Sequence, residues 1–302
     1  MGSSVAALPK RSEAATDASA DFLVVGAGIA GAVAARTLAE AGRRVLVVAA
    51  GTGASHAPAA VVNPVRAKRG KPVPEAARAL EAAARFYGRF TRLHFGLYHR
   101  VPEAVRPRFE RGLEDSGLEY RWQGERLSLP GAFWLRPRPL IAALLAGIPR
   151  IKDRVLFPEP GGLWLASGRY LKGTVIWAAG AEGAGFVEAN PTLTAGSLLL
   201  VAEPGDGAIQ EVFHAGGAVG GSYRPLERYV EPTPTAGELA ELREKAARLL
   251  GRPPTPLGVF SGVRYRRSEP LAEASFGFFF TGFGSTAFLR APMLARRLLD
   301  LL

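Results

Sequence analysis

The chain has 302 residues, an apolar fraction of 48%, a formal net charge of +11 and no cysteine. This length indicates one large domain or two closely joined ones. The missing cysteines exclude disulfides, thiolate metal ligands and cysteine nucleophiles, and they fit a reducing, cytoplasmic location. No apolar run is long enough and free enough of charge to span a membrane, so we expect no membrane partner.

The positive charge has two interpretations. A basic surface attracts polyanions such as RNA, or acidic substrates. However, the chain has 32 Arg against 6 Lys and abundant Ala and Gly, as a GC-rich genome would encode. We favour this compositional bias over nucleic-acid binding.

The first hundred residues begin with a leader and a βαβ pattern. Residues 1–20 are small and polar and are predicted to form a flexible leader, with an apolar piece too short for a signal peptide. Phe22–Val25 and Val45–Val48 are typical of buried strands. Between them, residues 29–41 are predicted to be a helix that ends at Gly42. A parallel sheet is therefore expected.

The rest of the chain alternates short strands and helices. Helices are predicted over residues 75–93, 139–146 and 235–250 and at the end of the chain, and strands near residues 120–122, 132–135, 155–157, 163–166, 170–171, 173–177, 198–202, 211–215, 219–223 and 276–280. Thr235 with Glu238 forms a capping-box pair at the start of one helix.

Three glycines mark the turn after the first predicted strand. In Gly26-x-Gly28-x-x-Gly31, the first glycine permits the turn, the second admits a pyrophosphate, and the third lets helix and strand pack closely. Free N–H groups at Ile29, Ala30 and Gly31 favour an anion at the helix N-terminus. The strand–helix context makes a dinucleotide site the favoured interpretation over a ligand-free turn.

Three segments carry a family resemblance: the opening βαβ unit, "TVIWAAGAEG" and "TGFGSTAFLRAPMLARRLL". Together they resemble the superfamily of FAD-dependent D-amino-acid oxidases and glycine oxidases, over residues 21–302. Within it, "GASHAPAAVVNP" (53–64), "HAGGAVGGSYRP" (214–225) and residues 282–299 look most similar to the FAD domain of a bifunctional enzyme. That enzyme builds methylaminomethyl-uridine at the tRNA wobble position.

The resemblance implies an α/β fold: a Rossmann-like FAD-binding domain of the glutathione-reductase type, with a smaller, mainly antiparallel β substrate domain. The FAD-binding domain would be discontinuous, over residues 21–82, 138–185 and 258–302. Residues 83–137 and 186–257 would form the substrate domain.

The resemblance also implies which residues would bind FAD. The pyrophosphate would lie on the glycine turn, Ala54 and Ser55 near the phosphates or flavin, and Ala178, Ala179 and Gly180 under the adenine half. The late glycine turn would face the flavin ring, where N–H groups at a helix N-terminus stabilise negative charge. That turn comprises Gly282, Phe283, Gly284, Ser285 and Thr286.

One usual feature is missing. An acid that binds the ribose normally follows the second strand, but this chain has Ala49 and Ala50 there, and no Asp or Glu from residue 41 to 74. FAD binds without this contact, or the site prefers a 2′-phosphate near Arg43 or Arg44, or the site has decayed. We favour the first, because the other matches are to flavin oxidases.

In the resembled superfamily, the flavin accepts a hydride from the carbon beside an amine nitrogen, and the protein orients the substrate. Arg264 in "SGVRYRRSEP" matches the arginine that binds the substrate carboxylate, a role that suits a guanidinium. Tyr223 is a weaker candidate for a pocket hydroxyl. The four histidines form no metal-ligand pattern, so no metal is expected.

We therefore predict an amine or amino-acid oxidase that passes electrons to molecular oxygen. Its substrate would be a small glycine-like amine, or the carboxymethylaminomethyl group of a tRNA wobble uridine. Residues 66–71, "RAKRGK", supply positive charge for tRNA. The alternative is a degenerate scaffold that binds RNA or protein without turnover. The sequence predicts no oligomeric state.

Overall fold

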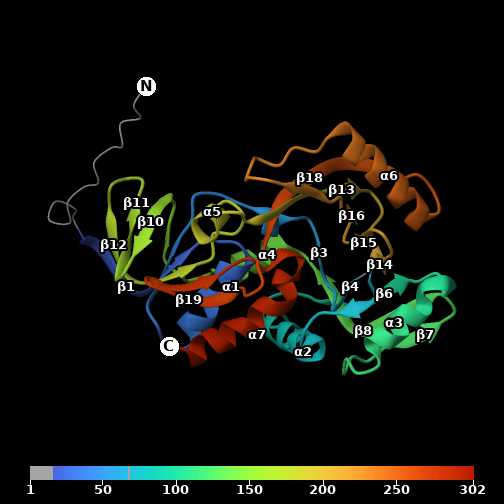
Figure 1. Ribbon diagram of the computed structural model, residues 1–302, viewed down its shortest axis with the longest axis horizontal. Helices are drawn as coiled ribbons and strands as arrows, with labels where there is room; N and C mark the ends of the chain where they lie inside the picture. The colour runs from blue at the N-terminus through green and yellow to red at the C-terminus, as the bar shows by residue number, and fades with distance from the viewer. Residues whose placement is uncertain (1–15, 67–68) are drawn as a thin grey trace.

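The computed structural model describes residues 16–66 and 69–302. The first of its two large sheets lies at the left in Figure 1. Its strand order is β10 (Val155–Glu159), β11 (Gly162–Leu165), β12 (Tyr170–Trp177), β1 (Thr16–Val25), β2 (Val45–Val48) and β9 (Arg150–Ile151). Strand β20 (Gly277–Phe280) also pairs with β12, and β19 (Leu271–Ala274) pairs with β20. The pairs β12–β1, β1–β2, β2–β9 and β12–β20 are parallel. This confirms the predicted βαβ opening.

Three helices cover one face of this sheet, and a β-hairpin with a short helix covers the other. The helices are α1 (Ile29–Glu40), α4 (Pro137–Leu144) and α7 (Ala287–Asp300), and α1 contacts both of the others. Gly42 has the positive φ of +77° expected just beyond a helix end. Hairpin β10–β11 and α5 (Ala184–Val187) bury the apolar side chains of the opposite face. The arrangement explains why the inner parts of these strands, Phe22–Val25, Val45–Val48 and Val175–Trp177, are continuous apolar runs.

The second sheet is mostly antiparallel and lies beside the first (Figure 1). Its order is β17 (Arg224–Leu226), β13 (Thr192–Val201), β16 (Ala218–Gly220), β15 (Phe213–Ala215), β14 (Asp206–Ile209), β6 (His94–Arg100), β8 (Arg126–Leu135) and β3 (Ala60–Val62). Strand β18 (Pro256–Arg266) pairs with β13, and β7 (Arg121–Gln123) pairs with β8. The mixed α/β architecture agrees with the predicted fold class.

Further helices and a small hairpin complete the fold. Helix α6 (Ala236–Leu250) packs on the second sheet through buried Leu242, Ala246 and Leu249, and its predicted capping box between Thr235 and Glu238 is present. The other elements are α2 (Ala76–Tyr87), α3 (Arg106–Leu113), the hairpin β4 (Val65–Arg66) with β5 (Lys71–Pro72), and the single turns η1 (Ala54–His56), η2 (Glu103–Val105) and η3 (Gly284–Thr286).

Four expectations about the elements change. Residues 16–20, expected in the leader, form the start of β1 because they pair with β12; residues 1–15 lie outside the described residues. The separate strands expected at 170–171 and 173–177 are one strand, β12. The sequence did not predict strand β6 or helix α3. Strand β6 pairs with β8 and β14, which are distant in the sequence, so no local pattern marks it.

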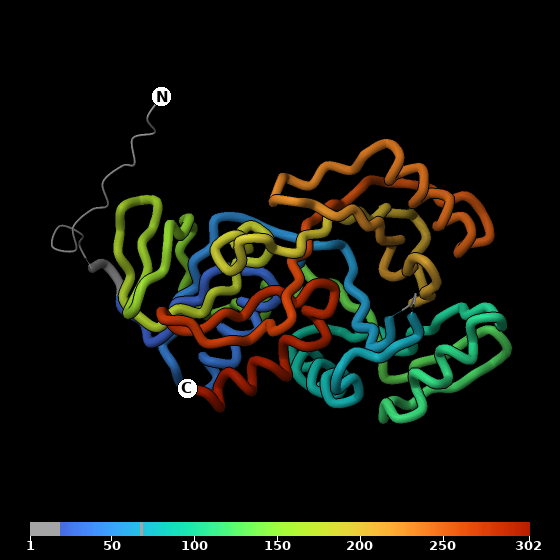
Figure 2. The backbone as a smooth tube through the Cα atoms, in the orientation of Figure 1, coloured from blue at the N-terminus to red at the C-terminus, as the bar shows by residue number. Residues whose placement is uncertain are grey.

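Two strands link the sheets. Figure 2 shows the chain leaving the first sheet and joining the second at β3, and β18 also belongs to the second sheet before the chain returns at β19. Strand β3 falls inside a segment that we assigned to the FAD-binding domain, and so does all of β18 except Pro256 and Leu257. The domain boundaries therefore stay a prediction. Among the described residues, no helix is long and apolar enough to cross a membrane.

Candidate functional site

A cavity of about 550 Å³ opens at the carboxyl ends of β1, β2 and β12 and extends to β18. This is the edge at which ligands bind in open α/β sheets. Of the residues predicted for the site, those that line the cavity are Gly26, Gly28, Ile29, Ala30, Ala54, Ser55, Ala178, Ala179, Gly180, Gly282, Phe283, Gly284 and Arg264. Gly31, Ser285, Thr286 and Tyr223 do not line it. The fold thus brings together five segments that are separated in the sequence.

The turn after β1 requires its glycines. Gly26 has φ of +104°, and a Cβ there would lie 2.5 Å from the carbonyl oxygen of Ala178. A Cβ on Gly31 would lie 1.9 Å from the carbonyl oxygen of Gly26. Helix α1 starts at Ile29 with no side-chain cap and no acid in its first turn. Its N-terminal N–H groups at the cavity therefore suit a pyrophosphate.

The segment after β2 has no carboxylate. The residues from Ala49 to Gly53 line the cavity and carry only methyl, hydroxyl or hydrogen side chains. Arg43 and Arg44 precede β2 at its other end and line a separate hollow, and Arg44 is paired with Asp21 at 2.8 Å. The 2′-phosphate interpretation is not supported, because these arginines stand a strand length away.

The late glycine turn, at the end of β20, also lines the cavity. Gly282 has φ of +79°, and a Cβ there would lie 2.2 Å from Cγ of Arg267. Helix α7 begins at Ala287, which lines the cavity, so the positive end of its dipole lies at this wall. Thr281 also lines the cavity; it is 2% exposed, and its hydroxyl has no hydrogen-bond partner among the described residues. Sequence reasoning missed Thr281, although it directly precedes the quoted Gly-x-Gly.

Arg264 reaches the cavity from β18. It pairs with Thr194 on β13 in backbone register, and its Nη2 donates to the carbonyl oxygen of Ser222 at 3.2 Å. A Cβ on Gly196 would lie 2.5 Å from this Nη2, so the glycine makes room for the guanidinium. Burial lowers the pKa of Arg264, but an arginine remains charged in proteins. Its position at the cavity agrees with a role in anion binding.

Tyr223 lies differently from the pocket hydroxyl that we expected. Its side chain is 69% exposed, and its ring centroid lies 5.9 Å from the Cζ of Arg264. It therefore flanks Arg264 rather than lining the cavity, and its role in the site stays a prediction.

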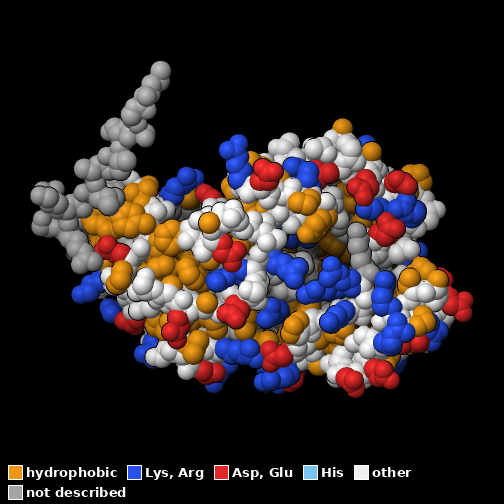
Figure 3. Space-filling model, in the orientation of Figure 1, with side chains coloured by type: hydrophobic (Ala, Val, Ile, Leu, Met, Phe, Trp, Pro, Cys, Tyr) orange, Lys and Arg blue, Asp and Glu red, His pale blue; other side chains and the backbone are white. Residues whose placement is uncertain are grey.

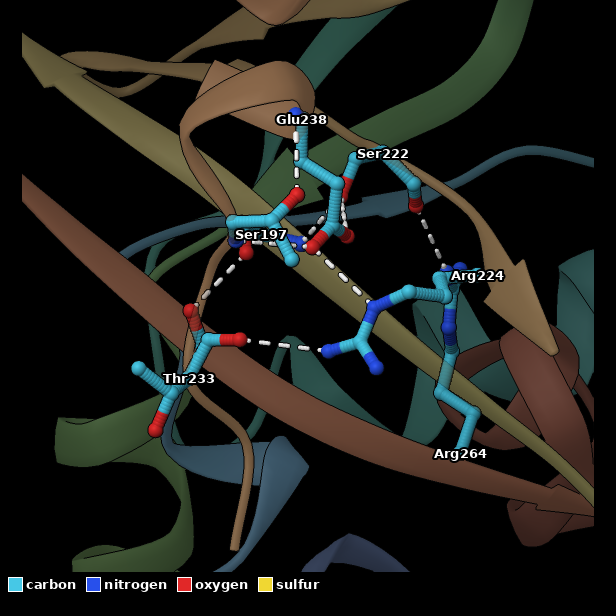
Figure 4. A network of polar contacts seen from close by, with 8 residues as sticks. Ser197, Ser222, Arg224, Thr233, Glu238 and Arg264 are labelled. Atoms are coloured by element: carbon cyan, nitrogen blue, oxygen red, sulfur yellow. Dashed lines mark hydrogen bonds and ion pairs between the residues drawn. The ribbon is translucent and has the colours of Figure 1, made fainter. Parts of the chain in front are cut away.

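A polar network fixes the backbone that Arg264 contacts (Figure 4). The Glu238 carboxylate accepts from the Ser222 hydroxyl at 3.1 Å, from Nε of Arg224 at 3.1 Å and from the Thr235 N–H at 3.0 Å. The Ser222 hydroxyl accepts from the N–H of Ser197 at 2.9 Å. Burial acts to raise the pKa of Glu238, but these hydrogen bonds outweigh it and lower the pKa. The cap of α6 thereby holds the carbonyl that orients the guanidinium.

The four histidines lie apart from the cavity lining. His99 is 1% exposed, and burial lowers its pKa to about 4. His94 stacks on Trp134 with ring centroids 3.8 Å apart. Among the described residues, no group of three His, Asp or Glu side chains could hold a metal ion.

Comparison with known proteins identifies the family. Residues 21–301 match the family described as FAD dependent oxidoreductase (DAO). The chain belongs to this family. The glycine turn, the free N-terminus of α1 and the second glycine turn are the features of this oxidoreductase that suit its FAD cofactor.

Solved structures with a similar fold include two oxidases and a dehydrogenase. Glycine oxidase from Geobacillus kaustophilus is 19% identical with a TM-score of 0.75, covering 94% of each chain. Iminodiacetate oxidase from Chelativorans sp. BNC1 is 20% identical with a TM-score of 0.75, covering 92% of this chain and 94% of its own. L-proline dehydrogenase from P. horikoshii is 16% identical with a TM-score of 0.76, covering 94% and 93%. At these identities the likeness shows the fold. Among the curated proteins, none matches the sequence of this chain.

Proposed function

We propose that this oxidoreductase oxidises the C–N bond of a glycine-like amine whose carboxylate binds Arg264. The observation that carries the proposal is a half-buried guanidinium at the cavity, which donates to the backbone carbonyl of Ser222. A buried cation without a carboxylate is costly unless a ligand supplies the negative charge. A planar substrate carboxylate does so with two parallel hydrogen bonds.

The fold places Arg264 at the same cavity as the segments that suit FAD. Arg264 lies on β18, which reaches the same cavity as the late glycine turn from Gly282 to Gly284 and the η1 residues Ala54 and Ser55. When bound, FAD would supply the hydride acceptor for the carbon beside the nitrogen, and molecular oxygen would take up the two electrons as hydrogen peroxide. The protein's task is to hold that carbon at the right distance. No general base from a histidine is required.

Relatives of the same fold support this substrate class. Two of them are named as oxidases of glycine and of iminodiacetate, and both compounds carry a carboxylate one carbon away from the nitrogen. We infer that a compound of this type is the substrate, and that oxygen is the electron acceptor. The dehydrogenase of L-proline shows that the acceptor must be tested separately.

The test is anaerobic bleaching of the flavin absorbance by glycine, sarcosine and iminodiacetate, followed by peroxide measurement in air. We expect Arg264→Ala to raise KM for the best substrate about 100-fold, because a charge-assisted bidentate contact is lost. Arg264→Lys recovers part of this loss. Arg243→Ala, on the exposed face of α6, serves as the matched control and leaves KM unchanged.

Each outcome has a distinct meaning. A colourless protein that cannot be reconstituted with FAD would support the alternative of a scaffold without turnover. Bleaching by an amine that lacks a carboxylate, with Arg264→Ala unchanged, would overturn the assigned role of Arg264. Bleaching without peroxide in air would identify a dehydrogenase.

A second candidate substrate is the carboxymethylaminomethyl group of a tRNA wobble uridine, which contains the same N–CH₂–COO⁻ unit. Figure 3 shows Lys and Arg side chains gathered around a hollow on this face of the molecule. Arg66 and Lys71 pair in hairpin β4–β5, Arg69 lies between them, and Arg66 acts electrostatically on half-buried Arg290; Lys68 lies outside the described residues. This candidate is supported if modified tRNA alone bleaches the flavin and binding weakens steeply with salt.

A further inference from the structure

The strand beside β2 supplies the carboxylate that β2 itself lacks. Strands β2 and β9 are parallel, with Val47 opposite Arg150 and Val48 opposite Ile151. The N–H of Ala49 donates to the carbonyl oxygen of Ile151 at 3.1 Å, so the pairing continues past the end of β2. Asp153 follows Ile151 by two residues, just beyond the end of β9.

Asp153 lines the same cavity as Ala49 and Ala50. Its Oδ2 accepts from the hydroxyl of Ser167 at 2.6 Å, and its Oδ1 accepts from the N–H of Arg154 at 2.7 Å. The Ser167 hydrogen bond is the main reason that the pKa of Asp153 lies below its usual value, so the carboxylate is ionised at neutral pH. A backbone hydrogen bond from Ser167 also lowers this pKa, and a carboxylate with about four acceptor sites keeps one for a ligand.

The surroundings of Asp153 fit an adenosine. Leu156 and Phe186 line the cavity although they are 53% and 43% exposed, and they offer apolar surface to an adenine ring. The guanidinium of Arg154 lines the cavity as well and is paired with Glu182 at 3.1 Å.

We propose that Asp153 binds the ribose hydroxyls of the FAD adenosine, in place of the acid that normally follows β2. The proposal rests on FAD binding in this cavity and not on the identity of the substrate. The ribose lies between the glycine turn and the end of β2 in such folds, and a carboxylate from the adjacent strand reaches the same hydroxyls from the side.

The other carboxylates of the cavity are less suited. Glu182 already faces the guanidinium of Arg154, and Glu231 accepts from the Tyr229 hydroxyl at 3.3 Å. Both are exposed side chains on segments that do not pair with β2. Among these acids, only Asp153 follows a strand that is hydrogen-bonded to β2.

The experiment measures nucleotide binding to the apoprotein by calorimetry and needs no turnover. The wild-type protein is titrated with ADP and with 2′,3′-dideoxy-ADP, which lacks both hydroxyls. We expect ADP to bind about tenfold more tightly, the scale of a charged hydrogen bond. Asp153→Asn should reduce this preference to about twofold, while the affinity for FMN, which has no adenosine, stays unchanged.

Two further variants separate a ribose contact from a structural role. Glu182→Gln, on the other side of Arg154, should keep the preference for ADP. Ala49→Glu, which restores the usual acid, should recover it in the Asp153→Asn background. The midpoint of thermal unfolding of each apoprotein reports whether loss of the hydrogen bond between Asp153 and Ser167 has destabilised the fold.

The results distinguish the proposals. A wild-type protein that binds FAD but does not distinguish the two nucleotides overturns the role of Asp153, even if no variant folds. An Asp153→Asn variant that keeps the full preference also overturns it. If neither FAD nor ADP binds, FAD binding in this cavity fails, and the role of Asp153 fails with it.

Discussion

The two sheets contribute to the cavity in different ways. The first sheet contributes mainly backbone: glycines at the ends of β1 and β20, N–H groups at the start of α1, and an apolar core beneath them. The second sheet contributes the guanidinium of Arg264 on β18, and Ser222, which is held by the N–H of Ser197, gives this guanidinium a carbonyl partner.

This difference corresponds to two chemical tasks. A dinucleotide presents phosphates and rings of fixed shape, which backbone N–H groups and the absence of side chains can bind. A small substrate must be distinguished from others, and this requires placed charges such as Arg264 and a network that holds them. We therefore expect damage to the first sheet to abolish FAD binding, and damage to the second to change substrate binding alone.

The largest effect that tests this contrast is expected from Gly31→Ala. The new Cβ would lie 1.9 Å from the carbonyl oxygen of Gly26, and both partners are backbone. The turn must shift, which we expect to lower the free energy of unfolding by about 3 kcal/mol and to remove most of the bound FAD. Chemical denaturation and flavin absorbance per protein measure the two effects.

Gly237→Ala is the matched control. This glycine lies in the exposed first turn of α6, where the nearest atom to a new Cβ is 4.0 Å away. Stability and FAD content should be unchanged or slightly higher. Full FAD occupancy in Gly31→Ala would show that the first turn does not depend on its backbone geometry.

The same contrast explains what could be predicted from sequence. The turn from Gly26 to Gly31 is local, and each glycine has a steric reason that the spacing reveals. Asp153 could not be found in this way, because its place at the cavity depends on β9 pairing with β2 across a hundred residues. Strand β6 was missed for a similar reason, since its burial comes from β8 and β14. Arg264 was found by resemblance and not by pattern.

The second prediction concerns pH and the core of the second sheet. The pKa of His99 is about 4 in the folded protein because the ring is buried, against about 6.5 in an unfolded chain. Between these values the unfolded state binds the additional proton, so stability falls as the pH falls from about 6.5 towards 4. From pH 7 to pH 5 we expect a loss of about 2 kcal/mol, and no contribution from His99 above pH 7.

His99→Gln should remove this part of the pH dependence, although it also loses the ring contact with Phe109. His94→Gln, at the stacked contact with Trp134, is the control and should keep most of it. Denaturation at pH 5, 6 and 7 gives the slopes. If the free energy of unfolding changes equally with pH in wild type and His99→Gln, His99 does not contribute to the pH dependence of stability.

The smallest expected effect comes from Gly196→Ala. This glycine of the second sheet leaves the space that the guanidinium of Arg264 occupies. The new Cβ would lie 2.5 Å from Nη2 of Arg264 and 2.7 Å from the carbonyl oxygen of Ser222. The guanidinium and the carbonyl must both move away from the new methyl group, so we expect KM for the carboxylate substrate to rise about tenfold, or about 1.4 kcal/mol, with FAD still bound.

A double-mutant cycle isolates the cause of this change. If Gly196→Ala acts by displacing the guanidinium, it should have no further effect on KM in the Arg264→Ala background. An additive increase would show instead that the methyl group obstructs the substrate directly. Loss of FAD from Gly196→Ala would contradict the separation of tasks between the sheets, because this glycine lies on β13 and does not line the cavity.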